Sequence, residues 1–277
     1  MFSREIIDDS WRYYRELLAS ENAVAAGICE LSGYFFTKDG PEKVSNAHLA
    51  RLCADYRPAT ERELRLCPGG WTNGVFCTTL LADDTYHLGW LTERFKEAGG
   101  TIIEAEVRDL RELAGYDIVA NCSGLGAKRL LNDRRLVPLR GQVYKVKAPW
   151  IKTFLYCGED TYVIPGVDHV TLGGSRRFAA TSLDIDKYES KAIWERCTRY
   201  VPSLRRAQIV EEWVGLRPHR DPVRIEKERL DTGLTVVHCY GHGGYGVMTA
   251  PGSAALVSRL VTEVTSGDFT NPAISSL

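Results

Sequence analysis

The chain has 277 residues, enough for one large domain or two interleaved domains, and its 44% hydrophobic and 26% charged residues argue against a disordered chain. With 35 basic and 36 acidic side chains the net charge is -1, so no basic surface points to a nucleic-acid partner. No run approaches the roughly 18 apolar residues of a membrane span, and residues 1–9 lack the apolar core of a signal peptide, so no membrane partner is expected.

The N-terminal half is predicted to alternate between helices and strands. The pattern predicts, in chain order, a helix at 10–18, a strand at 28–36, a helical turn at 60–64, a helix with one face at Leu88, Leu91, Phe95 and Ala98, and strands at 101–107 and 116–120. Two glycines at 99–100 end the second helix. The apolar core of the last strand indicates cover on both faces of a sheet.

The C-terminal half is predicted to be richer in strands. Strands are expected at 143–146, 162–164, 170–172, 209–216 and 234–237, a helix at 184–200, and a last helix after residue 246 with apolar residues Ala255, Leu256, Leu260, Val261 and Val264 at helical spacing. There is no internal repeat, low-complexity tract or clean linker. This organisation favours two domains woven from alternating segments over two successive domains.

The eight cysteines and six histidines show no metal-ligand spacing. No two cysteines form a Cys-x-x-Cys pair, and several lie inside apolar strands, which predicts buried free thiols. His238 and His242 are four residues apart, but a strand end and a Gly-rich turn separate them, so they would not share a helical face. We therefore expect no metal site.

A Gly-rich turn follows the last predicted strand, with glycine at four of the six positions 241–246. A strand, such a turn and a helix bring backbone N–H groups close to an anionic or polarised ligand, because glycine has no Cβ and a helix N-terminus carries partial positive charge. The alternative is a flexible turn that requires positive φ, and the glycines alone do not decide between the two.

Arginines at predicted strand ends are further candidates. Arg217 follows an apolar strand, and Arg176 and Arg177 follow the strand at 170–172. A planar guanidinium binds a carboxylate through two hydrogen bonds, so these residues suit a substrate with two carboxylates; the alternative is solvated surface arginines. Tyr162 is either a phenol donor in a cleft or a core tyrosine. The sequence contains no Gly-x-Ser-x-Gly elbow, no pair of metal-binding carboxylates and no phosphate-binding Gly-x-x-x-x-Gly-Lys loop. A cofactor, and not a side-chain nucleophile, would therefore carry out any catalysed reaction.

A series of short motifs occurs in a fixed order from about Trp11 to the C-terminus. They lie at 31–34, 90–94, 121–124, 140–142, 148–150, 163–166, 171–174, 215–218 and 240–246, and include Gly215-Leu216-Arg217-Pro218. In these motifs the chain resembles the D-amino-acid oxidases, which are FAD-dependent flavoenzymes.

The resemblance implies an α/β fold of mixed α+β type. A Rossmann-like FAD-binding part at 76–139 and 216–267 would be interleaved with a mixed-sheet substrate-binding part at 10–75 and 140–215, followed by a tail at 268–277. Members of the family begin with a strand, a Gly-x-Gly-x-x-Gly turn and a helix. No such motif precedes Trp11, and a βαβ unit requires about 30 residues, so we expect the FAD-binding part to lack its N-terminal βαβ unit.

The resemblance also implies roles for individual residues. Arg217 corresponds to the arginine that binds the substrate α-carboxylate, Tyr162 to its phenolic partner, and Gly244 to the carbonyl that receives the α-amino group. The residues expected to contact FAD are Val107, Ser123, Gly243, Gly246, Val247 and Met248. Met248 stands where the family often has threonine, which puts one flavin hydrogen bond in doubt.

Within the family, Arg176 and Arg196 match two arginines of the D-aspartate oxidase branch. A buried acidic side chain requires a paired cation, which agrees with this assignment. The resemblance therefore implies oxidation of D-aspartate or D-glutamate: hydride passes from the substrate Cα to FAD, the imino acid hydrolyses to a 2-oxo acid and ammonia, and molecular oxygen is reduced to hydrogen peroxide. Two alternatives stay open, an oxidase of neutral D-amino acids and a non-catalytic remnant with weak or no FAD binding.

The last three residues, Ser275-Ser276-Leu277, approximate the Ser-Lys-Leu peroxisomal signal without its basic middle residue. Peroxisomes suit an oxidase that produces hydrogen peroxide, so we expect a peroxisomal location, and otherwise a cytoplasmic one. The alternative is a tail without a targeting function. The oligomeric state is not indicated by the sequence.

Overall fold

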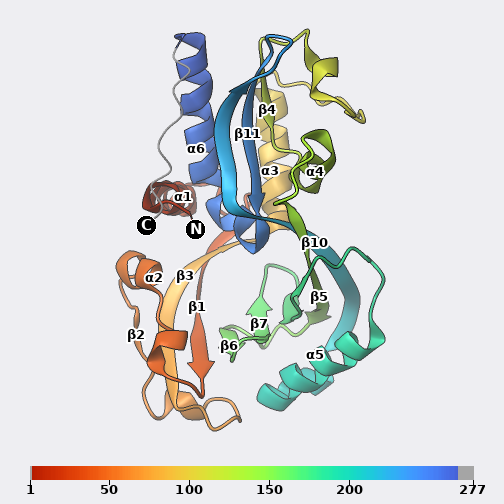
Figure 1. Ribbon diagram of the computed structural model, residues 1–277. Helices are drawn as coiled ribbons and strands as arrows, with labels where there is room; N and C mark the ends of the chain where they lie inside the picture. The colour runs from red at the N-terminus through yellow and green to blue at the C-terminus, as the bar shows by residue number, and fades with distance from the viewer. Residues whose placement is uncertain (1, 268–277) are drawn as a thin grey trace.

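The computed structural model describes residues 2–267. In this range one mixed sheet of 11 strands runs through both lobes of the molecule (Figure 1). The strands are β1 (Ile28–Thr37), β2 (Arg57–Pro58), β3 (Asn73–Ala82), β4 (Ile118–Asn121), β5 (Val137–Lys147), β6 (Phe154–Cys157), β7 (Thr161–Pro165), β8 (Val170–Gly173), β9 (Arg177–Phe178), β10 (Gln208–Arg229) and β11 (Thr235–His242). Their order is β2-β3-β1-β6-β7-β8-β5-β10-β11-β4, and β9 pairs with β5.

Helices cover this sheet at both ends of the molecule. They are α1 (Arg4–Leu18), α2 (Ala47–Leu52), α3 (Asp84–Glu97), α4 (Ala127–Leu130), α5 (Lys187–Tyr200) and α6 (Gly246–Thr265), with short 3-10 helices that include η2 (Glu63–Arg65) and η6 (Gly243–Tyr245). Helix α5 packs on β5, β7 and β8, and α1 packs on α6. Over residues 2–267, none of the helices is both long enough and apolar enough to traverse a bilayer.

Strand β10 connects the two lobes. Its first half pairs with β5, from Gln208 opposite Lys147 to His219 opposite Val137. Its second half pairs with β11 from Arg224 onward, and the register shifts between His219 and Arg224. The strand thus passes from the lower lobe to the upper lobe, and places residues 216–220 at their junction (Figure 1).

Each lobe has its own apolar core. In the lower lobe, Val146, Leu172 and Ile193 are buried between α5 and the sheet. In the upper lobe, Ile6 of α1 and Val237 of β11 are buried together with side chains of α6. Apolar burial of this kind stabilises both lobes independently of the site at their junction.

Most predicted elements are confirmed, but several are longer than predicted: α1 begins at Arg4, β5 spans Val137–Lys147 and β10 continues to Arg229. Strands β2, β3, β6 and β9 have no counterpart among the predicted elements. The predicted helices correspond to α1, α3, α5 and α6, and the predicted strands to β1, β4, β5, β7, β8, β10 and β11. The strand predicted at 101–107 is wrong: these residues form no regular element, and Ile102 and Ile103 are 60% and 71% exposed. They lie outside the described sheet, and β-branched composition without a pairing partner does not make a strand.

One expectation about an apolar face differs from the structure. On α3 the predicted apolar face is exposed, and Leu88 and Leu91 line an open hollow bounded by α1 and α6, whereas His87 is buried. Strand β4 is the last strand of the described sheet, yet it has apolar contacts on both faces, with Ile118 packed against one core cluster and Val119 against another. Periodicity identifies an apolar face, but it does not say which neighbour covers it.

Segments that are distant in the chain alternate between the two lobes. Residues 76–82, which the resemblance assigns to the FAD-binding part, lie in β3, which pairs with β1 in the other lobe. Helix α1, grouped with the substrate-binding part from residue 10, packs on α6 of the upper lobe. The domain boundaries themselves stay a prediction.

A glycine allows the close contact between α1 and α6. An ideal Cβ on Gly252 would lie 2.1 Å from the carbonyl oxygen of Ile6, and the Gly252 N–H donates to the Ser10 hydroxyl over 2.9 Å. We expect Gly252→Ala to separate the helices and lower the free energy of unfolding by about 1–3 kcal/mol, measured by urea denaturation. In the matched control Gly89→Ala, the added Cβ on α3 meets no atom within 4 Å, so stability should not fall. Equal losses in the two variants would contradict the packing argument.

Candidate active site

The residues predicted to bind substrate gather where the two lobes meet. Tyr162 comes from β7, Arg217 from β10 and Gly244 from η6, while Arg176 lies in the turn between β8 and β9. The sheet order β7-β8-β5-β10 brings these distant segments together. The charge of Arg217 acts on the phenol of Tyr162, so the two groups face each other electrostatically.

Two glycines in the intervening strands allow this approach. An ideal Cβ on Gly141 of β5 would lie 2.0 Å from Nη1 of Arg217. One on Gly173 of β8 would lie 2.0 Å from Cζ of Tyr162. A larger residue at either position would displace the guanidinium or the phenol, so the glycines of the motifs at 140–142 and 171–174 have a packing role in the site.

The guanidinium of Arg217 has the features of an anion-binding group. Its Nη1 is buried and has no hydrogen-bond partner in the described part of the chain. Leaving a buried donor without a partner costs free energy, so this atom indicates an absent acceptor. The parallel N–H groups of a guanidinium match the two oxygens of a carboxylate.

Two neighbouring phenols, those of Tyr162 and Tyr156, belong to this part of the structure. Burial raises the pKa of Tyr162 above its usual range, although the charges of Arg217 and Arg176 act in the opposite direction. Burial also raises the pKa of Tyr156, on β6, to about 12. The two rings have centroids 5.6 Å apart. Both phenols therefore stay protonated at neutral pH and can donate hydrogen bonds.

Arg176 is an exposed cation at the rim of the site. Within residues 2–267 its guanidinium makes no hydrogen bond or ion pair, yet its charge acts on the phenols of Tyr156 and Tyr162. The guanidinium is therefore close enough to both rings for its charge to favour the ionised form of each phenol. A free guanidinium beside two phenol donors is able to receive a second anionic group.

Arg196, the other arginine predicted to bind substrate, is engaged by the protein. From α5 its Nη2 donates to the carbonyl of Gly174 over 2.9 Å, and its Nε donates to the Thr161 hydroxyl over 3.2 Å. These contacts tie the turn after β8 to α5 and β7. The structure thus gives Arg196 a contact with the chain that carries Arg176, and direct binding of substrate by Arg196 stays a prediction.

The Gly-rich turn forms η6 and leads directly into α6. An ideal Cβ on Gly244 would lie 3.4 Å from Cδ of Arg217, so the turn lies over that side chain. No side chain caps the start of α6, which leaves its first-turn N–H groups available to a ligand. Four residues predicted to contact the flavin lie here: Gly243, Gly246, Val247 and Met248.

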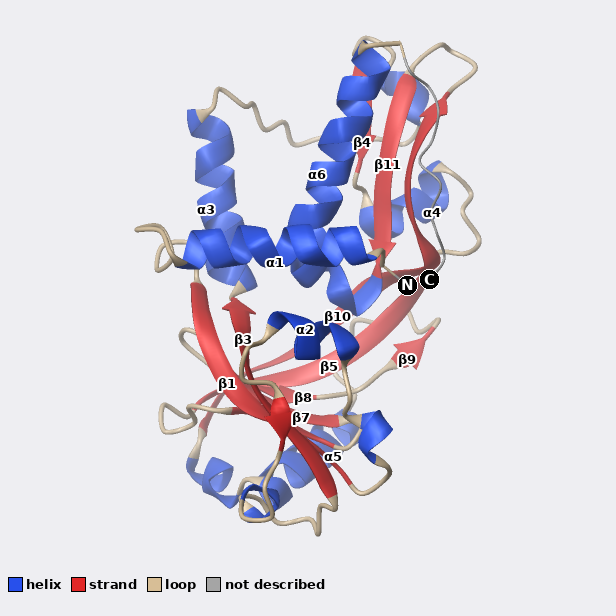
Figure 2. Ribbon diagram, turned by 90° about the vertical axis from the view of Figure 1, so that its left-hand side faces the viewer, coloured by secondary structure: helices blue, strands red, loops and turns tan. Residues whose placement is uncertain are grey.

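A hollow of ≈ 1060 Å³ opens beside the start of α6. It is bounded by α1, α3 and α6, which Figure 2 shows with α1 crossing α6, and Gly246 and Val247 lie in its wall. The Tyr14 hydroxyl donates to the carbonyl of Val247 over 2.7 Å and fixes the first turn of the helix. An uncapped helix start beside a large hollow fits a flavin, whose ring is flat and apolar with polar atoms along one edge.

Ser123 and Val107 lie away from this turn. Ser123 follows β4, and its hydroxyl donates to Oδ1 of Asn121 over 2.7 Å; the Asn121 amide lies 3.1 Å from Nδ1 of the buried His238 on β11. Since β4 and β11 are parallel, Ser123 and the Gly-rich turn follow strand ends at the same edge of the sheet. Val107 lies in the irregular segment after α3. Contact of both residues with FAD stays a prediction.

The sequence reasoning missed two members of the site. Tyr156 contacts Tyr162, and Tyr245 of η6 is near enough for its charge state to affect the pKa of Tyr156. Tyr245 lies inside the Gly-rich motif, so its position in the sequence could have identified it as a member of the site. Tyr156 lies in a short strand whose aromatic residues look like any apolar core, and only the pairing of β6 with β7 brings it to the site.

Comparison with known proteins gives a consistent result. A family model described as FAD dependent oxidoreductase matches residues 3–260. The D-aspartate oxidase of Homo sapiens is 40% identical over 250 residues, which cover 88% of this chain and 72% of that protein. The D-amino-acid oxidase of Streptomyces coelicolor is 40% identical over 194 residues, 68% of this chain and 60% of that protein. The fold is similar to a glycine oxidase from Bacillus cereus, with a TM-score of 0.78 at 18% identity over 98% of this chain and 84% of that one.

Proposed function

Because the chain belongs to the family of FAD-dependent oxidoreductases, we propose that it oxidises D-amino acids to 2-oxo acids, with release of ammonia and reduction of oxygen to hydrogen peroxide. We further propose that acidic D-amino acids, D-aspartate and D-glutamate, are its preferred substrates. The observation that carries the activity is the buried, unpartnered Nη1 of Arg217 beside the protonated phenol of Tyr162.

In this proposal Arg217 and Tyr162 bind the substrate α-carboxylate. The guanidinium supplies the charge and two parallel donors, and the phenol adds a third hydrogen bond. The carbonyl of Gly244, a residue that packs against Arg217, would accept a hydrogen bond from the α-amino group. Three fixed contacts around one carbon orient its Cα–H bond, so catalysis by the chain consists of positioning and electrostatics.

FAD, when bound, supplies the electron acceptor for the Cα–H bond. The residues that would hold it are Gly243, Gly246, Val247 and Met248 at the start of α6, together with Ser123 and Val107. The uncapped N-terminus of α6 would place partial positive charge at the polar edge of the flavin. No general base is required if the bound amine is neutral, and no such base is assigned.

The preference for acidic substrates is supported by Arg176. Its guanidinium is free of partners in the described range, and its charge acts on the phenols of Tyr156 and Tyr162. A second carboxylate on the substrate would meet this charge. The 40% identity to a D-aspartate oxidase supports the same conclusion. The D-amino-acid oxidase of Streptomyces coelicolor is also 40% identical to this chain, but over fewer residues. Oxidation of neutral D-amino acids is therefore the alternative, and the assay must distinguish it from oxidation of acidic ones.

The test is reconstitution of the purified 277-residue chain with FAD. We expect a visible flavin absorption band that remains after gel filtration, and peroxide formation that is faster with D-aspartate than with D-alanine. A colourless protein after reconstitution would favour the non-catalytic alternative. A coloured protein that prefers D-alanine would favour an oxidase of neutral D-amino acids.

Replacing Arg176 with leucine is expected to lower kcat/KM for D-aspartate by roughly 10- to 150-fold, because a charge-assisted hydrogen bond contributes about 1.5–3 kcal/mol. Turnover of D-alanine, which has no second carboxylate, should stay within about twofold of the unaltered chain. The matched control is Arg65→Leu, which removes an exposed arginine of η2 whose side chain is 71% exposed. Equal effects on D-aspartate and D-alanine would count against the assigned role.

We also propose a peroxisomal location through Ser275-Ser276-Leu277. These residues lie outside the described range, and the support is the tripeptide itself together with the peroxide that the proposed reaction releases. A fluorescent protein fused in front of residues 268–277 tests this proposal, with the same fusion lacking the last three residues as its control.

A further inference from the structure

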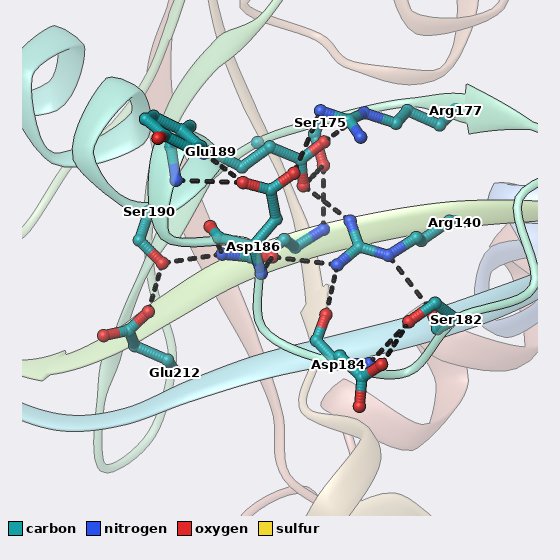
Figure 3. A network of polar contacts seen from close by, with 12 residues as sticks. Arg140, Ser175, Arg177, Ser182, Asp184, Asp186, Glu189, Ser190 and Glu212 are labelled. Carbon is teal, nitrogen blue, oxygen red and sulfur yellow. Dashed lines mark hydrogen bonds and ion pairs between the residues drawn. The ribbon is translucent and has the colours of Figure 1, made fainter.

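Figure 3 shows a network of polar side chains around Glu189, which includes Ser175 and Arg177, the two neighbours of Arg176 in the sequence. Its centre is Glu189 in the first turn of α5, whose side chain is 9% exposed. The main chain at this position is fixed because Asp186 caps the helix, with its carboxylate accepting hydrogen bonds from the N–H groups of Tyr188 and Glu189. The carboxylate of Glu189 is thus held at a defined place in the lower lobe.

This carboxylate binds two arginines and one serine. Oε2 accepts from Nη1 of Arg140 on β5 and, over 3.2 Å, from the hydroxyl of Ser175. Oε1 forms an ion pair with Nε of Arg177 on β9. The Ser175 hydroxyl in turn accepts from the backbone N–H of Gln142 over 3.0 Å. One buried group therefore joins α5, β5 and the turn between β8 and β9.

The two residues held in that turn are the immediate neighbours of Arg176. Ser175 and Arg177 are two residues apart, and both reach the same carboxylate. Because Ser175 and Arg177 are both tethered to Glu189, the main chain of Arg176 between them is held on both sides. The Arg176 guanidinium makes no contact with this network, and its charge acts on the phenols of Tyr156 and Tyr162.

The same ion pair also decides which arginine of the turn is available. Arg177 is engaged by Glu189 and lies 3.3 Å from Asp186. Arg176 has no ion pair within residues 2–267. Two adjacent arginines that look alike in the sequence are thus made unequal: one is neutralised by the protein, and the other presents its charge to the site.

We propose that Glu189 is a positioning residue for substrate selectivity. By holding Ser175 and Arg177 it fixes the place of the Arg176 guanidinium, and so sets the affinity for the second carboxylate of an acidic substrate. The inference rests on the proposed preference for acidic D-amino acids. The inference assigns part of that selectivity to Glu189, which touches neither substrate nor cofactor.

The first test is Ser175→Ala, which removes one tether and leaves the buried Arg140–Glu189 pair intact. We expect KM for D-aspartate to rise about tenfold with kcat changed by less than about twofold, and no change with D-alanine. A readout that needs no turnover is binding of succinate, which has two carboxylates, compared with butyrate, which has one. Calorimetry should show about tenfold weaker succinate binding and unaltered butyrate binding.

The matched control is Ser190→Ala. Ser190 belongs to the same buried network, where its hydroxyl accepts from Nε2 of Gln142 over 2.7 Å and contacts Glu212, but it does not touch the turn. It should leave the succinate affinity unaltered. Glu189→Gln, where it folds, should weaken succinate binding at least as much as Ser175→Ala. Hydrogen exchange of the backbone at 174–178 should rise in Ser175→Ala and not in Ser190→Ala.

The outcomes separate the two proposals. If Arg176→Leu loses succinate binding while Ser175→Ala and folded Glu189→Gln keep it, the positioning role is overturned and the acidic preference stands. If Arg176→Leu binds succinate as the unaltered chain does, the acidic preference fails, and the positioning role fails with it. Equal weakening of succinate and butyrate in Ser175→Ala indicates general damage to the site and also overturns the positioning role.

Discussion

Replacing Arg217 with leucine is expected to lower kcat/KM for every D-amino acid substrate by roughly thirtyfold to several thousandfold, because loss of one partner of a desolvated charge pair costs about 2–5 kcal/mol. The effect is general because the α-carboxylate is common to all these substrates. Steady-state kinetics with D-aspartate and D-alanine measures it, and butyrate binding gives a second readout independent of turnover.

The same variant should remain folded. Nη1 of Arg217 has no partner in the described chain, so its removal strands no buried carboxylate. The matched variant Arg217→Lys keeps the charge but not the planar fork, and should lose less activity than Arg217→Leu. Unaltered butyrate binding by a folded Arg217→Leu protein would remove the basis of the proposed carboxylate site.

Replacing Arg140 with methionine is expected to lower the free energy of unfolding by about 3–5 kcal/mol, because it leaves a buried carboxylate with an incomplete set of partners. The Arg140 side chain is 4% exposed and donates to Glu189, to Oε1 of Gln142, and to the carbonyls of Ser182 and Asp184. Urea denaturation should show a lower midpoint with an unchanged slope.

The control for this variant is Arg94→Met on α3. Arg94 is 53% exposed and pairs with Glu97 three residues later, so its loss should change stability by less than about 0.5 kcal/mol. If Arg140→Met and Arg94→Met lowered the free energy of unfolding equally, the buried contacts of Arg140 would stabilise the fold no more than an exposed ion pair does.

Much of the fold could be read from local patterns. The Gly-rich motif at 241–246 forms the turn η6 and the start of α6, and the periodic apolar residues of the last helix pack as expected, with Leu260 buried. The motifs that resemble D-amino-acid oxidases led to the family that the comparisons show. These features depend on backbone chemistry and on periodicity, which a single segment contains.

The errors share a cause. Residues 101–107 have the composition of a strand but no partner strand, and α3 has an apolar face at Leu88 and Leu91 that borders an open hollow. In both cases the composition or periodicity of the segment is real, and the missing information concerns what lies next to it. The contact of Arg196 with the Gly174 carbonyl was equally hidden from the sequence, because it depends on where α5 packs; its role in substrate binding stays a prediction.

The sequence by itself determined the type and order of most elements, the turn chemistry and the family, because these follow from residue types at fixed spacing, but it did not indicate β3 or β6. Residue type and spacing could not rank the arginines, since Arg140, Arg176, Arg177 and Arg217 all stand at or near predicted strand ends, and the roles given to Arg176 and Arg217 came from the family resemblance. Only the tertiary structure decided that Arg140 and Arg177 both form ion pairs with Glu189, while Arg217 has an unpartnered buried donor and Arg176 a free charge. The physical reason is that the charge partner of an arginine comes from another segment, so the availability of each guanidinium is a property of the packed sheet and of α5.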